Sequence, residues 1–154
     1  MKKVLIVGLV ALISVAFVNA QDSVKNAHKV KWEESFTKAE RLSKSKNKPM
    51  LIFFTGSDWC GPCKMLIEDF FSTEKFSSYK DKYVLYEADY PRNRDLVSAS
   101  QKKDNSKLQK KYGVSSFPTI VIVDSKGKEL DRRKGYNFMR DPSYHFALIE
   151  KHIK

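Results

Sequence analysis

Cysteine is scarce in this chain of 154 residues, and that scarcity argues against a disulfide-rich scaffold and a structural zinc site. The chain has only two cysteines, Cys60 and Cys63, so it is not a small scaffold held together by many disulfides. Histidine is scarce as well. A structural zinc site needs about four ligands, and the three histidines stand singly, so we expect no metal and a surface or packing role for each histidine. They are His28, His145 and His152.

Long hydrophobic runs are also rare. The exception is the uncharged, largely apolar segment 4–18, which is shorter than the roughly 20 apolar residues that a membrane-spanning helix needs. It follows Lys2 and Lys3 and ends at the small residues of 18–20, which is the pattern of a cleaved signal peptide. We therefore expect residues 1–20 to be removed on export and residues 21–154 to be periplasmic or secreted. An uncleaved membrane anchor is the competing interpretation.

Acidic residues are outnumbered, with 18 Asp and Glu against 29 Lys and Arg, which gives a net charge of +11. The lysines are scattered over 44–48, 102–111 and 126–134 instead of forming one stripe. Scattered cations are more typical of a solvated surface than of a nucleic-acid groove, so we expect no nucleic-acid partner. Acidic proteins or a negatively charged membrane surface remain alternative partners, and we expect the protein to be a monomer.

The two cysteines are separated by two residues, in the segment Trp59-Cys60-Gly61-Pro62-Cys63-Lys64. This spacing lets both sulfur atoms meet within one helical turn and form a disulfide. The loop that such a bond closes is too short to constrain the unfolded chain much, so a purely structural role is disfavoured. Because residues 21–154 are long enough to bury a core without covalent help, both thiols are available for redox chemistry.

The surroundings of the pair predict a strand followed by a helix. The apolar run 49–54 predicts a buried strand, and residues 64–71 carry apolar side chains at helical spacing, with Pro62 suited to the first helical turn. Cys60 would then lie at a helix N-terminus, where unpaired N–H groups stabilise a thiolate. We expect Cys60 to be the nucleophile and Cys63, one turn further, to resolve the mixed disulfide.

The remaining chain predicts alternating helices and strands. We expect an amphipathic helix over 32–46 anchored by Trp32, and a final helix from Pro142 that buries Tyr144, Leu148 and Ile149. This alternation predicts an α/β fold with a mixed central sheet and helices on both faces. The other expected elements are strands at 83–89, 119–123 and 128–134, a loop at 90–93, a surface helix or loop plus helix in 95–112, and a turn at 124–127.

Two segments resemble signatures of the thioredoxin superfamily: 59–64, quoted above, and Tyr112-Gly113-Val114-Ser115-Ser116-Phe117-Pro118-Thr119. The resemblance extends from about residue 32 onward, and residues 55–60 are similar to exported bacterial members. It implies a thioredoxin-like fold in which Pro118 is a cis-proline that faces the disulfide. It also implies that clients contact the surface around the disulfide, formed by Trp59, Gly61, Pro62, Phe117 and Pro118.

The resemblance further implies a function. It indicates an exported thiol-disulfide oxidoreductase that acts on protein thiols and disulfides, without a cofactor beyond its cysteine pair, and that is recharged by a membrane thiol-electron donor. The Gly61-Pro62 dipeptide is similar to that of reducing thioredoxins, which favours a reductase over an oxidase or isomerase. A rival from another class is an adaptor or metallochaperone that binds a soft metal such as copper(I) through both sulfurs.

The sequence also departs from the family pattern. Thioredoxins keep a buried aspartate at a strand position that falls here on Phe53 or Phe54, depending on a slip of one residue. The usual proton acceptor for Cys63 is therefore missing, and Glu87 in the strand 83–89 is the candidate acid/base substitute. A charged residue in such a strand is either exposed or buried for a functional reason; we expect Glu87 to be exposed, which would leave water to accept the proton. Phe117 is bulkier than is usual before the cis-proline, which would narrow the choice of client.

Overall fold

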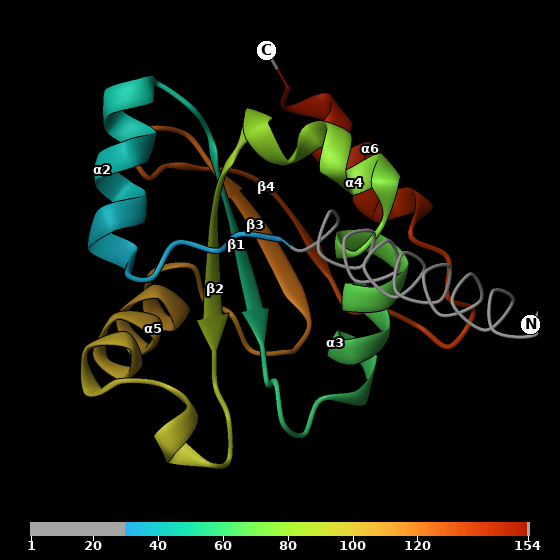
Figure 1. The fold of residues 1–154 in the computed structure, drawn as a ribbon, viewed down its shortest axis with the longest axis horizontal. Coiled ribbons are helices and arrows are strands. Elements are labelled where there is room, and N and C mark those ends of the chain that lie inside the picture. Colours follow the sequence, from blue (N-terminus) through green and yellow to red (C-terminus); the bar gives the residue numbers. More distant parts are fainter. Residues whose placement is uncertain (1–29, 154) are drawn as a thin grey trace, which may run out of the picture.

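The computed structural model describes residues 30–153, which form a four-stranded sheet in the order β2-β1-β3-β4 (Figure 1). The central strand β1 (Met50–Thr55) runs parallel to β2 (Val84–Asp89) and antiparallel to β3 (Thr119–Val123). The edge strand β4 (Glu129–Lys134) is antiparallel to β3. The expected mixed sheet is thus confirmed, whereas the predicted signal peptide, residues 1–20, lies outside the described residues.

Helices cover both faces of this sheet (Figure 1). One face carries α2 (Phe36–Lys46) and α5 (Ala99–Lys111). The other carries α3 (Gly61–Leu66), α4 (Glu74–Tyr79) and α6 (Ser143–Lys151). Within residues 30–153, no helix is long and apolar enough to span a membrane. Three short helical turns complete the elements: the π-helical turn Ile67–Phe71, which continues α3, and the 3-10 turns Lys80–Lys82 and Arg94–Leu96.

Every residue of β1 is buried because β1 lies between two apolar layers. Successive side chains of a strand point to opposite faces, so Phe53 joins the cluster under α3 and Phe54 joins the cluster under α2. The cluster under α3 also contains both cysteines. Phe53 packs there against Phe71, with ring centroids 4.7 Å apart. The cysteine pair therefore shares an apolar cluster with aromatic side chains that include Phe53 of the sheet.

The first helix starts later than predicted. Ser35 ends the extended segment before α2, and its hydroxyl accepts a hydrogen bond from the Lys38 N–H at 3.3 Å, which fixes the first helical turn at Phe36. Trp32 therefore lies outside the helix. It packs against Phe53 on the face that carries α3, with ring centroids 5.9 Å apart, whereas Phe36 contacts Tyr86 on the other face. The prediction of Trp32 as the anchor of the first helix is wrong.

The final helix starts near Pro142 as predicted, but its buried face differs from the prediction. Tyr144 is 61% exposed, and the inward position belongs to His145, which is 3% exposed. Leu148 and Ile149 are buried as expected. The helix α4 was not predicted at all; Thr73 caps it by accepting the Phe76 N–H at 3.1 Å.

Candidate active site

Cys60 and Cys63 form a disulfide at the start of α3, with Cα atoms 5.2 Å apart. Cys60 is the N-cap residue, and its sulfur accepts a hydrogen bond from the Cys63 N–H at 3.2 Å. Pro62 occupies the first turn, where its missing N–H removes no helical bond, and Gly61 is exposed beside it. Cys60 is 3% exposed and Cys63 is fully buried, so the predicted nucleophile is the sulfur nearer to solvent.

The loop that leads from β1 to the pair is fastened to the end of β2. The Ser57 N–H and hydroxyl donate to the two carboxylate oxygens of Asp89, at 2.8 and 2.6 Å. Asp58 accepts the backbone N–H groups of Arg92 and Asn93, at 3.0 and 2.8 Å. These backbone donors, the Asn93 N–H first, lower the pKa of Asp58, so the carboxylate stays ionised and the two loops stay joined.

Trp59 precedes Cys60, and two contacts hold its ring in place. Its indole N–H donates to the Tyr90 carbonyl at 2.8 Å, and its ring meets Phe117 edge-on at 5.8 Å between centroids. The ring lies directly over Gly56: a Cβ there would approach within 2.3 Å of the indole, so only glycine fits. Trp59 is 39% exposed, so part of the residue remains accessible from solvent.

The Phe117-Pro118 peptide bond is cis, as the family resemblance implied. Phe117 also stacks on Tyr90, with ring centroids 5.1 Å apart, and it packs against the apolar cluster that contains the cysteines. The Gly135 N–H donates to the Pro118 carbonyl at 2.8 Å. The structure thus brings Trp59 and Phe117 together, although they are far apart in the sequence.

The structure shows which face of the sheet carries Phe53, Phe54 and Glu87, and it changes the expectation for Glu87. Phe53, not Phe54, shares the cluster of the cysteines, which resolves the slip of one residue left open by the sequence. Glu87 pairs with Phe53 across β1 and β2, so its side chain emerges on the face of the cysteines. The prediction of an exposed Glu87 is wrong, since the residue is partly buried. Burial first, and then the charge of Asp89, raises the pKa of Glu87 to about 7.

The histidines give no sign of a metal site. His145 packs in the core, and His152 contacts Asp131 at 3.1 Å, while His28 lies outside the described residues. Over the described range, no group of three or more His, Cys, Asp or Glu side chains could hold a metal ion.

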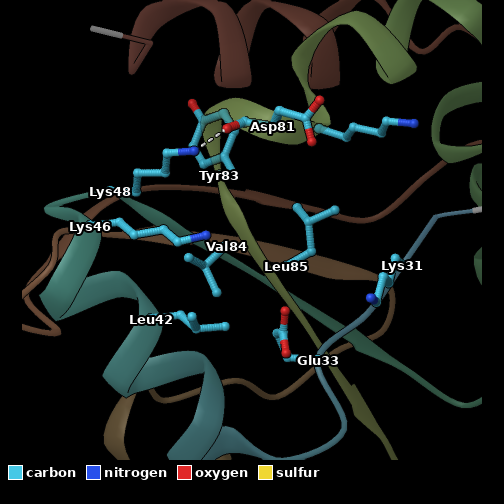
Figure 2. Close-up of a pocket in the computed structure, with 10 residues that line it drawn as sticks. Lys31, Glu33, Leu42, Lys46, Lys48, Asp81, Tyr83, Val84 and Leu85 are labelled. Carbon is cyan, nitrogen blue, oxygen red and sulfur yellow. Dashed lines mark hydrogen bonds between the residues drawn. The ribbon is translucent and has the colours of Figure 1, made fainter.

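A pocket of about 320 Å³ is lined by several lysines, among them Lys31, Lys46 and Lys48 (Figure 2). It adjoins Val84, which pairs with Met50 where β1 begins, whereas Cys60 follows the other end of β1. In it, the Lys48 amino group donates to the Asp81 carbonyl at 2.6 Å (Figure 2). The pocket is therefore not part of the candidate active site.

Sequence reasoning missed four residues that hold the site in place: Asp58, Asp89, Tyr90 and Arg92. Their contacts join segments more than thirty residues apart, and no local pattern predicts such pairing. A signal did exist for Asp58, since it lies within the segment that resembles exported family members.

Known proteins resemble this chain over most of its described length. Disulfide bond reductase DsbH of Chlamydia pneumoniae is 33% identical over 107 residues, which cover 69% of this chain and 63% of the relative. The thioredoxin-related protein DsbJ of the same organism is 26% identical over 109 residues, or 70% of this chain and 31% of that protein. The chain thus spans less than two thirds of the length of these relatives.

A solved structure of a DsbH oxidoreductase superposes with a TM-score of 0.69 at 27% identity, over 80% of this chain and 84% of that one. The oxidised thioredoxin of Plasmodium falciparum gives a TM-score of 0.55 at 24% identity, which bears on the fold alone. A family model described as a thioredoxin-like domain matches residues 36–141. Because that match covers more than half of the sequence and includes both cysteines, the chain belongs to the thioredoxin-like domain family.

Proposed function

We propose that this protein is a thiol-disulfide oxidoreductase that acts on protein disulfides through Cys60 and Cys63. The observation that carries the proposal is the disulfide at the N-terminus of α3. Phe117, which precedes the cis-proline, contacts Trp59 and packs against the apolar cluster that contains both cysteines. The similarity to DsbH supports the same activity. We place client contacts on Trp59, Gly61, Pro62, Phe117 and Pro118.

The first step of the proposed reaction uses Cys60. In the reduced protein the Cys63 N–H, which contacts the Cys60 sulfur, favours the thiolate form of Cys60. This thiolate attacks one sulfur of a client disulfide. A mixed disulfide forms, the client S–S bond breaks, and one client thiolate leaves.

The second step uses Cys63, which must lose its proton before it attacks the Cys60 sulfur. That attack forms the Cys60–Cys63 disulfide and releases the second client thiolate, so two electrons pass to the client. Phe53 supplies no acceptor for the proton. Glu87 is the carboxyl group that we assign to this task, because it emerges on the same face and its raised pKa, about 7, suits a general base near neutral pH.

We further propose that the protein works as a reductase outside the cytosol. The Gly61-Pro62 dipeptide, the apolar segment 4–18 and the name of the relative, disulfide bond reductase, support this direction and compartment. A reductase in an oxidising compartment must be recharged, and a membrane thiol-electron donor is the class of partner that we propose.

The activity can be tested by insulin reduction with dithiothreitol as electron source, together with metal analysis of the purified protein. We expect catalytic turnover without bound metal, and loss of turnover in Cys60→Ser. Bound copper with no turnover would instead support the adaptor or metallochaperone alternative.

The direction can be tested by equilibrating the pair against glutathione. A reduction potential near the thioredoxin value of about −270 mV supports the reductase, and one near about −120 mV, typical of a strong oxidant, contradicts it.

A further inference from the structure

Arg92 holds a positive charge beside the nucleophile. Its guanidinium carbon lies 5.5 Å from the ring of Trp59, the residue that precedes Cys60. Its backbone N–H donates to Asp58 at 3.0 Å, so the loop that carries it is tied to the loop that carries Cys60. The side chain itself is exposed, and its cation–π contact with Trp59 keeps its charge beside that ring.

The nearby carboxylates Asp58 and Asp89 form hydrogen bonds to backbone N–H groups and to Ser57 instead of to the Arg92 guanidinium. Over residues 30–153, neither Arg92 nor the neighbouring Arg94 has a carboxylate oxygen within 4.0 Å. The carboxylate left in this loop is the exposed Asp95. Within the described residues, Arg92 therefore forms no ion pair at contact distance, although its charge also contributes to the lowered pKa of Asp58.

The contact with Trp59 leaves this arginine able to bind an anion. A cation–π contact does not use the N–H donors of a guanidinium, so those donors stay available for two parallel bonds to a carboxylate. Arginine and tryptophan are also enriched at the energetic centres of protein interfaces. A client disulfide that reaches Cys60 must pass close to Trp59, and hence close to Arg92.

We propose that Arg92 makes the surface beside Trp59 and Cys60 selective for client segments that carry an acidic residue next to the reacting cysteine. The inference rests on the proposed function and adds a substrate class to it. Its physical basis is charge complementarity between a positioned guanidinium and a client carboxylate, which raises the rate of productive encounter and weakens with salt.

The test uses a short peptide with one internal disulfide, made with Glu, Gln or Lys next to one cysteine. The rate constant for exchange with the reduced protein is measured for each peptide and divided by the rate with free dithiothreitol, which removes the intrinsic reactivity of each disulfide. We expect the order Glu, Gln, Lys, with a Glu-to-Gln ratio of about three at low salt that falls at high salt.

Matched variants assign the effect. Arg92→Gln should bring the Glu-to-Gln ratio to about one, and Arg92→Lys should keep part of it. Asp95→Asn should increase the ratio. Arg41→Gln removes the same charge from an exposed site on α2, which covers the other face of the sheet, and should keep the wild-type ratio.

Three outcomes would overturn the inference: a wild-type ratio near one, a ratio unchanged in Arg92→Gln, or an equal loss in Arg41→Gln. In each of these cases the proposed function survives, because exchange with the peptides still occurs. If the reduced protein exchanges with none of the three peptides, the proposed function fails first and the inference fails with it.

Discussion

Cys60 and Cys63 share one helical turn but differ in their surroundings, and the proposed division of labour follows from that difference. Cys60 is reached by a backbone N–H and lies nearer to solvent, whereas Cys63 is fully buried above Phe53. A thiol in an apolar environment gives up its proton reluctantly. The resolving step therefore depends on a proton acceptor more than the attacking step does, and Glu87 is the residue to which we assign that role.

Glu87→Gln tests this assignment. It should slow disulfide reduction by roughly the 10²-fold low end of general-base effects, because the amide cannot take the proton of Cys63. Alkylation of Cys60 in the reduced protein should remain nearly as fast as in the wild type, since that reaction does not involve Cys63. Stopped-flow reduction and iodoacetamide kinetics measure the two rates. Equal reduction rates in both proteins would mean that water, not Glu87, accepts the proton.

At the scale of helices and strands, the sequence predicted the sheet better than the helices that cover it. Residues 50–54 and 119–123, almost all of them apolar, are buried on both faces of the sheet, so these strands can be predicted without knowing which strands they pair with. Helix boundaries depend instead on single capping residues. Ser35 is the N-cap of α2, so that helix begins after Trp32, and Thr73 is the N-cap of α4, which was not predicted.

The candidate site divides in the same way. The cysteines and Trp59 lie in a recognisable segment of the sequence, whereas the cis form of Pro118 was implied by the family resemblance and is seen in the structure. The contacts that hold the site together depend on strand register and loop packing. The burial of Glu87, for example, follows from its pairing with Phe53, which a reading of its own strand cannot reveal.

The helix α6 carries a titratable residue in its buried face, and this predicts an acid-sensitive stability. Burial first, and then the charge of Arg133, lowers the pKa of His145 to about 4, against 6.5 for an ordinary histidine. The folded protein therefore binds fewer protons than the unfolded chain between these values. The contribution of His145 to the free energy of unfolding is therefore fully present above about pH 6.5 and is lost as the pH drops toward 4.

Replacing His145 by Phe should remove this part of the acid sensitivity. Between pH 7 and pH 5 the wild type should lose about 1–2 kcal/mol more than His145→Phe does. Urea unfolding of both oxidised proteins at the two pH values measures the difference. His152→Phe, which changes a more exposed histidine, is the control. The same pH dependence in wild type and His145→Phe would show that His145 does not titrate as described.

At the scale of the whole molecule, we propose that residues 21–154 form one domain and that the apolar segment 4–18 belongs to a cleaved signal peptide. We predict that the exported protein begins at Gln21. N-terminal sequencing or intact mass of the protein recovered from the periplasm or medium measures this. Retention of residues 1–20 would indicate a membrane anchor instead.

If Cys60 attacks and Cys63 resolves, mixed disulfides should be trapped when Cys63 is replaced. In Cys63→Ser the attack survives but the resolution fails, so client proteins should accumulate as covalent complexes on Cys60. Non-reducing electrophoresis, with reduction as the control, measures the complexes, and mass spectrometry identifies the cysteine that is bound. We predict abundant complexes in Cys63→Ser and almost none in Cys60→Ser. Abundant complexes in Cys60→Ser, with none in Cys63→Ser, would show instead that Cys63 is the nucleophile and Cys60 the resolving cysteine.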